Sequence, residues 1–252
     1  EGKKAKIGSI AFEGNDRLSD RKLKKGMETK RRWWFLGGKY DESKFETDLT
    51  KVIDKYGDVG RMEAEITGTE MTYSPSGKSV DIKVSVVEGP EYTVATVEPG
   101  NNEVYDDDEI MDITKTQPGV VHNKSQVNAD AETIRDGYES SGYINANVEP
   151  QVTLNKEEKT THVVQQVQEG DLKYVKEITV TGNDITRDDV VRREIFLNPG
   201  ERFDGGLLEA SHRRLESTEY YDAIRFSTLD LPEDPRHSDL LVDVDEGKTG
   251  FF

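Results

Sequence analysis

The chain has 252 residues, no cysteine and a net charge of −17, from 34 Lys and Arg against 51 Asp and Glu. Disulfides are excluded, and the excess of acid disfavours nucleic acid and anionic membrane surfaces, which bind clustered cations. The apolar fraction of 33% is low for one large core and favours several small domains.

The first predicted element is a strand from Lys6 to Phe12, in which Ile10 and Phe12 alternate with polar residues. Further along, a helix is predicted because apolar residues recur at helical spacing and Ser43-x-x-Glu46 resembles a start signal. Its apolar stripe consists of Phe45, Leu49, Val52, Ile53 and Tyr56. A polar turn at 74–78 then separates two strands, the second of which alternates strictly at Val80, Ile82, Val84 and Val86. Such alternation predicts one buried face and one wet face.

The same order of elements is predicted twice more. Short helices are indicated by Asp106-x-x-Glu109 and Thr186-x-x-Asp189, which resemble capping boxes. Longer helices follow, with the stripe Val127, Ala131, Ile134 and Tyr138 in the second copy and Leu208 and Leu215 in the third. The last strand alternates at Leu240, Val242 and Val244. Each unit therefore reads β-α-α-β-β.

Sequence landmarks recur in the same order in all three copies, which indicates an internal repeat of about 80 residues. The opening pairs are Gly14-Asn15, Asn101-Asn102 and Gly182-Asn183. The closing pairs are Glu88-Gly89, Glu169-Gly170 and Glu246-Gly247. Between them lie Gly37-Gly38, Pro118-Gly119 and Pro199-Gly200, then Gly60, Gly142 and Glu219. We predict three domains, residues 1–90, 91–171 and 172–248, in an α+β fold whose three-stranded mixed sheets are each covered on one face by two helices.

Motifs that would indicate catalysis are weak. Gly77-Lys78-Ser79 resembles the end of a phosphate loop, but Thr72 stands where the earlier glycine is required, so a hairpin turn is favoured. The acidic run 106–109 lacks the spacing of a calcium loop and suits a helix start. The four histidines have no metal-ligand spacing. We predict a protein that is not an enzyme and binds no cofactor or metal.

The repeated unit, with Gly-Asn after the first strand and Glu-Gly after the third, resembles the POTRA domain (polypeptide-transport-associated). POTRA arrays precede the membrane barrel in BamA-type outer-membrane assembly proteins. The segment 32–40, with Trp33 and Trp34, resembles the tryptophan-pair loop of the third domain of such arrays. The segments 175–184 and 190–194 resemble the fifth. The three copies would then be POTRA domains three to five, and residues 249–252 would start the truncated barrel.

The resemblance implies a periplasmic scaffold, on the inner side of the bacterial outer membrane, that binds unfolded outer-membrane barrel precursors and docks accessory lipoproteins. Its own C-terminal membrane barrel would be a further partner, and no nucleic acid is expected. In this family the second strand of the unit is an exposed edge to which an extended chain can add. In the first copy we assign that edge to Met62, Glu63, Ala64, Glu65, Ile66, Thr67, Gly68 and Thr69.

Two further sites are predicted. The third copy would bind the lipoprotein partner, with Arg192, Arg193 and Glu194 as candidates, although a solvated helix face explains the same residues. Trp33 and Trp34 are predicted to pack against their own or the adjacent domain, with an exposed protein contact as the alternative. Two other functions remain open: the POTRA array of a secretion or translocation pore, and a structural spacer that binds no client.

Overall fold

The computed structural model describes residues 5–30 and 38–247. The chain divides into two compact units, Glu1–Val97 with Lys115–Ala129 and Gln151–Val164, and Glu98–Thr114 with Asp130–Pro150 and Gln165–Phe252. The first copy of the repeat lies in the first unit and the third copy in the second, while residues of the second copy belong to both.

Each copy has the predicted β-α-α-β-β order. The first copy consists of β1 (Lys6–Glu13), α1 (Asp20–Lys24), α2 (Glu42–Gly57), β2 (Glu65–Tyr73) and β3 (Ser79–Val87). The second consists of β4 (Thr93–Gly100), α3 (Asp107–Ile113), α4 (Lys124–Ser140), β5 (Asn147–Asn155) and β6 (Thr160–Gln168). The third consists of β7 (Tyr174–Thr181), α5 (Asp188–Arg192), α6 (Gly205–Glu216), β8 (Tyr221–Asp230) and β9 (His237–Glu246).

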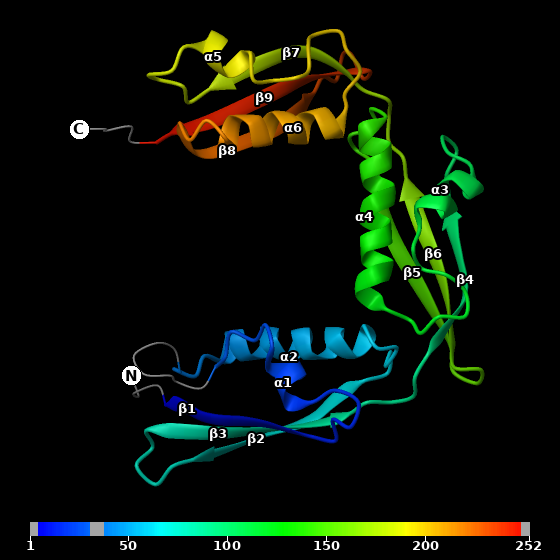
Figure 1. Ribbon diagram of the computed structural model, residues 1–252, viewed down its shortest axis with the longest axis vertical. Helices are drawn as coiled ribbons and strands as arrows, with labels where there is room; N and C mark the ends of the chain where they lie inside the picture. Colours follow the sequence, from blue (N-terminus) through cyan, green and yellow to red (C-terminus); the bar gives the residue numbers. More distant parts are fainter. Residues whose placement is uncertain (1–4, 31–37, 248–252) are drawn as a thin grey trace. The chain divides into compact units, whose positions relative to one another are not determined.

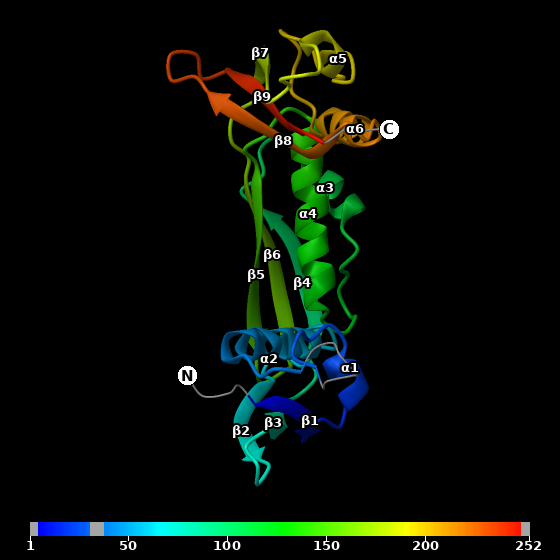
Figure 2. The same ribbon diagram turned by 90° about the vertical axis from the view of Figure 1, so that its left-hand side faces the viewer.

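Each copy forms a three-stranded sheet, in the orders β1-β3-β2, β4-β6-β5 and β7-β9-β8. In the first and third sheets the central strand pairs parallel with one neighbour and antiparallel with the other, so these sheets are mixed. Helices α1 and α2 cover one face of the first sheet (Figure 1), and α5 and α6 lie on one side of the third (Figure 2). The predicted fold class is confirmed.

The central strand supplies the buried face of the first sheet. Val80, Ile82 and Val84 are at most 1% exposed, and they pack with Phe45, Val52 and Tyr56 of the helical stripe in one core. Full burial of such a side chain contributes about 1.5–3 kcal/mol. The alternation read from the sequence therefore does place one face of this strand against α2.

The start of α2 differs from the prediction. Asp41, not Ser43, is its N-cap, and the Asp41 carboxylate accepts a hydrogen bond from the amide of Lys44 at 3.3 Å. A capping side chain must precede the first helical turn to reach the free amides there, and Ser43 already lies inside the helix.

The two predicted capping boxes have different outcomes. The box of Asp106 and Glu109 is present at the start of α3. The box of Thr186 and Asp189 is absent: Arg187 is the N-cap of α5 and makes no side-chain cap hydrogen bond. Thr186 is held instead by Glu246, whose carboxylate accepts its amide at 2.6 Å.

The opening landmark of the repeat is a backbone requirement. Gly14 and Gly182 have φ of 81° and 79°, and a Cβ there would lie 2.2 Å from the carbonyl oxygen of Val86 and 1.9 Å from that of Val244. In the second copy Asn101 occupies the opening position with φ 62°. The position therefore demands a left-handed backbone, which glycine and asparagine tolerate best.

The asparagine that follows closes the same loop in every copy. Its side-chain amide donates to the carbonyl three residues later, from Asn15 to Leu18 at 2.8 Å, from Asn102 to Tyr105 at 3.0 Å and from Asn183 to Thr186 at 2.9 Å. An asparagine side chain can satisfy a turn carbonyl in this way because its amide lies close to its own backbone.

The closing glutamate of each copy ties that loop to the end of the central strand. Glu88 accepts the amide of Arg17, Glu169 accepts the amides of Glu103 and Val104, and Glu246 accepts those of Ile185 and Thr186. The asparagine that ends each opening pair and the glutamate of each closing pair thus stabilise the same loop.

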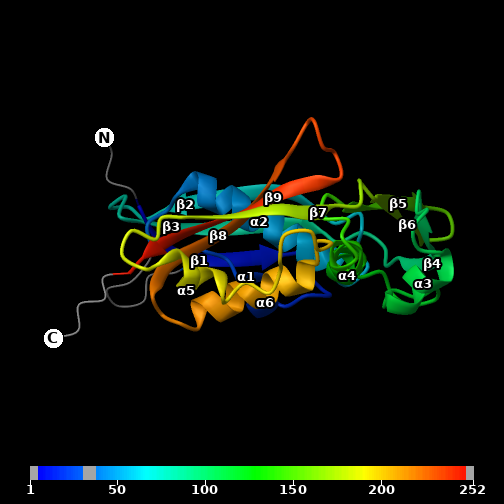
Figure 3. The ribbon, with the colours of Figure 1, turned by 90° about the horizontal axis from the view of Figure 1, so that it is seen from above.

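The turn between β8 and β9 projects beyond its sheet when seen from above (Figure 3). It is anchored at its base by Lys173, whose ammonium donates to the carbonyl of Pro235 at 2.7 Å. Lys173 is 4% exposed, so water solvates its ammonium poorly. The oxygens of Pro235 and Asp230 replace that water.

Candidate polypeptide-binding edges

The second strand of the first copy begins later than predicted. Met62 and Glu63 lie in a turn, and β2 runs over Glu65–Tyr73. The predicted range 62–69 therefore includes three residues before the strand and omits its last four. The Gly60-Arg61-Met62 segment is a connection, because Gly60 has φ 75° and its carbonyl accepts the amide of Tyr92 at 2.8 Å.

β2 is an edge strand, since β3 is its one neighbour in the sheet order. The register pairs Tyr73 with Val80 and Glu70 with Lys83, and just beyond the strand the amide of Ser74 donates to the carbonyl of Ser79 at 2.9 Å. In an antiparallel pair the residues bonded to the partner alternate with residues whose backbone groups point away. The backbone N–H and C=O groups of Thr69, Met71 and Tyr73 consequently face the open side of the sheet.

The opposite edge of the first sheet is covered at its start. The amide of Ile7 donates to the carbonyl of Gly38 at 2.6 Å, and the amide of Tyr40 donates to the carbonyl of Ala5 at 3.0 Å. The other copies repeat this cover, where Val94 donates to Val120 and Val175 donates to Glu201, both at 2.8 Å. Residues just before α2, and their counterparts in the other copies, thus occupy the start of the β1-type edge.

The three β2-type edges are not equivalent. β5 contains Pro150, which has no N–H to offer an incoming strand. β8 contains Arg225, which pairs with Asp243 of the neighbouring strand through its guanidinium. β2 contains neither a proline nor a basic residue, and its exposed residues are mostly small or threonine. Proline and lysine are the strongest guards of an edge against pairing, and β2 lacks both; its charged residues are the acidic Glu65 and Glu70.

The predicted docking residues lie at the end of α5 but face different surroundings. Arg192 is exposed and pairs with Asp188 one helical turn earlier. Glu194 is 9% exposed, and its carboxylate accepts from Arg214 at 2.7 Å and from Arg193 at 3.0 Å. The hydrogen bond from Arg214 holds the pKa of Glu194 below its ordinary value. Glu194 is therefore held by residues of its own copy and is not free to bind a partner. The exposed charged groups beside it are the guanidinium groups of Arg193 and Arg214.

Phe196 was not singled out from the sequence. It is 47% exposed, and its amide donates to the Ser211 hydroxyl of α6 at 2.9 Å. Leu207, 39% exposed, is tied to the same hydroxyl through its carbonyl. Both residues are thus held through their backbones to Ser211, which lies three positions before Arg214 on α6. An apolar residue two positions after an Arg-Arg-Glu triplet was the signal available in the sequence.

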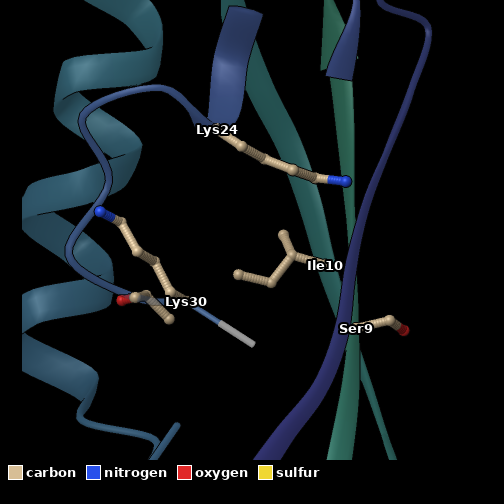
Figure 4. Close-up of a pocket in the computed structure, with 5 residues that line it drawn as sticks. Ser9, Ile10, Lys24 and Lys30 are labelled. Carbon is tan, nitrogen blue, oxygen red and sulfur yellow. The ribbon is translucent and has the colours of Figure 1, made fainter. Parts of the chain in front are cut away.

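Trp33 and Trp34 lie outside the described residues. Among the described residues, a cavity of about 250 Å³ is lined by Ser9, Ile10, Lys24, Thr29 and Lys30 (Figure 4). The Ser9 hydroxyl turns away to Asp81, donating at 2.6 Å. The lining brings no pair of reactive groups together, so we assign it no function.

Within residues 5–30 and 38–247, no group of three or more His, Asp or Glu side chains is arranged to hold a metal ion. His122 is buried against the Thr161 hydroxyl at 3.0 Å, and burial lowers its pKa. In that part of the chain, none of the helices combines the length and apolar composition that crossing a bilayer requires.

Comparison with known proteins gives consistent matches. The model of the POTRA family, described as "Surface antigen variable number repeat", matches residues 5–89, 92–170 and 173–247. The outer membrane protein assembly factor BamA of Neisseria meningitidis serogroup B is 33% identical over 256 residues, which is 99% of this chain and 32% of that protein. A putative outer membrane protein assembly factor of Treponema pallidum is 25% identical over 89% of this chain and 27% of that protein. The chain thus spans about a third of the length of these relatives.

A solved structure has the same arrangement of elements. The crystal structure of POTRA3-5 of Haemophilus influenzae BamA matches with a TM-score of 0.81 at 24% identity, covering 96% of each chain. At this identity the match shows the fold alone. Together with the sequence matches, it confirms the resemblance to a BamA-type POTRA region.

Proposed function

Because the chain belongs to the POTRA family, we propose that it is a periplasmic scaffold of outer-membrane protein assembly, and that it binds unfolded precursors by adding their strands to β2. Its relatives are named as assembly factors, which supports the process. The mode of binding is supported by one observation: the outward backbone groups of Thr69, Met71 and Tyr73 lie on an edge that carries no proline and no basic residue.

The strength of such binding follows from the number of free backbone groups. Three outward residues offer up to six hydrogen bonds, which at about 0.5–1.5 kcal/mol each total roughly 3–9 kcal/mol. Association costs at least about 4 kcal/mol. The surplus is small, so a client is released easily, as a protein that passes precursors onward requires. Recognition through backbone groups also suits clients of diverse sequence.

We also propose that the third copy docks an accessory lipoprotein through the exposed Phe196, together with Arg193 and Arg214 around Glu194. Phenylalanine and arginine are among the residues enriched at protein interfaces. Arg192 is left out of this proposed site, because it pairs with Asp188 on α5 and not with Glu194.

Substitution of Thr69 by proline tests the strand-addition site. Proline removes one outward N–H and leaves the hydrogen bonds between β2 and β3 in place, since Thr69 bonds on the open side. The matched control is Thr69→Ala, which shortens the same exposed side chain and keeps the N–H. We expect a barrel-strand peptide, followed by NMR, to bind the alanine variant like the parent and the proline variant several-fold more weakly.

Equal binding to a folded Thr69→Pro variant would show that clients do not use this edge. Absence of binding to any unfolded outer-membrane protein would favour the structural spacer. Binding of one dedicated client, with no response to other precursors, would favour the array of a secretion or translocation pore.

A further inference from the structure

The charge of the protein is distributed very unevenly along the chain. Residues 1–89 contain 18 Lys and Arg against 16 Asp and Glu, a net charge of +2. Residues 90–252 contain 16 against 35, a net charge of −19. Since charges are screened over about 8 Å at physiological salt, a partner responds to the local charge and not to the total of −17. An anionic partner is therefore not excluded at the first copy.

The cations of the first copy gather on and after α1. Arg21, Lys22 and Lys25 are exposed, and none of them forms an ion pair among the described residues. We refer to these three residues as the α1 basic surface. They line a shallow hollow of about 920 Å³ over α1, together with Ser19, Asp20 and Lys24. Lys24 differs from the three, because it is paired with Asp20 at 2.9 Å.

The neighbouring helix α2 adds to this positive potential. The ammonium of Lys55 reaches across and donates to the carbonyl of Leu23 at 2.7 Å. Burial, together with the nearby Lys25 and Lys51, lowers the pKa of Lys55. The ammonium of Lys55 therefore adds a further positive charge beside Lys25.

The other copies show that the fold does not require these charges. α1, α3 and α5 occupy the same place in the repeat, and each buries one apolar side chain, Leu23, Ile110 and Val191 respectively. Their exposed positions differ in sign: α3 reads DDEIMDI, with acidic residues throughout, and α5 reads DDVVR. Because only the buried residue is common to the three helices, the basic side chains of α1 are available for a function that the other copies lack.

We propose that the α1 basic surface binds an acidic polypeptide segment of another protein, through ion pairs with Asp and Glu side chains. Arg21, Lys22 and Lys25 span about 6 Å of helix rise on and directly after α1, so one short extended segment can pair with all three within a screening length of about 8 Å. A membrane fits less well, because stable binding at a lipid surface needs an apolar face to insert. The apolar residues of this region, Leu18, Leu23 and Met27, are all buried.

Charge reversal in the complete chain tests the proposal. The test variant carries Arg21→Glu, Lys22→Glu and Lys25→Glu. The control carries Lys6→Glu, Lys39→Glu and Lys78→Glu, which changes the net charge of the same copy equally at exposed positions off α1. Circular dichroism checks that both remain folded. Binding of a dye-labelled polyglutamate peptide is measured by fluorescence anisotropy at low and physiological salt, with polyglutamine as the neutral probe.

We expect the α1 variant to bind polyglutamate about tenfold more weakly or worse, the control variant to bind like the parent, and polyglutamine not to bind. Equal losses in both variants would overturn the proposal, since binding would then follow net charge and not a site. Binding of the protein to vesicles that contain phosphatidylglycerol is measured as the last comparison. Binding to vesicles without binding to polyglutamate would also overturn it, in favour of a lipid surface.

Discussion

The ammonium of Lys173 lies 3.2 Å from the carboxylate of Asp230, at the base of the β8–β9 turn. The lysine side chain is almost fully buried, whereas Asp230 remains largely exposed. Hydrogen bonds from Ser238 and from Lys173 hold the pKa of Asp230 below its ordinary value. The pair therefore links the entry of the third copy to its terminal hairpin.

Substitution of Lys173 by methionine is expected to destabilise the third copy by about 1–2 kcal/mol, because the carbonyl of Pro235 loses its donor. The loss is smaller than for a fully buried pair, since water can still solvate Asp230. Hydrogen exchange of β8 and β9 amides measures it. Lys176→Met is the control, because Lys176 is exposed and 4.0 Å from its partner Asp234. Matching exchange rates in the two variants would contradict this role.

Asp48 is expected to make the first copy sensitive to acid. Its carboxylate is fully buried and accepts the amides of Glu28 at 2.8 Å and Thr29 at 2.7 Å. Burial raises its pKa, but the hydrogen bonds from Thr29 and Glu28 and the nearby Lys51 together outweigh burial, so the net pKa is lowered. A carboxyl group with a lowered folded-state pKa adds stability above its unfolded pKa of about 3.9, and that stability disappears as the pH falls through the folded value.

Substitution of Asp48 by alanine should therefore lower the unfolding free energy of the first copy at pH 7 by about 1–3 kcal/mol and flatten its acid dependence. Urea titration monitored by the NMR signals of β1 and β3 at pH 7 and below pH 4 provides the measurement. Glu46→Ala is the control, at an exposed position on the same helix. An unchanged pH dependence in Asp48→Ala would show that another group dominates.

A pair of glycine substitutions separates steric clash from backbone strain. Gly182→Ala places a Cβ 1.9 Å from the carbonyl oxygen of Val244 at φ 79°, whereas Gly200→Ala meets nothing within 4 Å at φ 87°. Both alanines must adopt a left-handed backbone, which destabilises the folded state by about 1 kcal/mol. Only Gly182→Ala adds a steric clash. We expect Gly182→Ala to be the more damaging by several kcal/mol in chemical denaturation. Comparable losses would mean that strand β9 shifts to relieve the contact.

Phe196→Ala tests the proposed lipoprotein surface. About half of this side chain is already exposed, so truncation should change stability by less than about 1 kcal/mol. Binding of the accessory lipoproteins of the assembly complex, measured by surface plasmon resonance, should fall about tenfold or more. Arg192→Ala is the comparison and should bind like the parent. A larger loss of binding in Arg192→Ala than in Phe196→Ala would show that the docking site lies on the exposed face of α5 instead.

The repeat and its element order could be predicted because each rests on short-range patterns. Val80, Ile82 and Val84 alternate along the sequence, and strand geometry converts that spacing directly into one buried face. The opening and closing landmarks could also be recognised in the sequence, but the contact between them could not be predicted. Gly14 with Val86, and Glu88 with Arg17, come from opposite ends of a copy, so only the folded chain brings them together.

Caps were less predictable, for two different reasons. At α2 the choice was between two nearby side chains, and Asp41, not Ser43, lies at the start of the helix. At Thr186 the amide is taken by Glu246 of the distant strand β9, and no local pattern reveals such a partner.

The sequence by itself determined that three like α+β units follow one another, because hydrophobic period and turn chemistry are local properties of the chain. The tertiary structure decided which groups are free to bind. Whether the amide of Thr69 faces β3 or the open side, and whether Glu194 is presented or held by Arg214, depends on strand register and on packing between distant residues. Those relationships are set by the fold as a whole, because a shift of one residue in register turns every outward group inward.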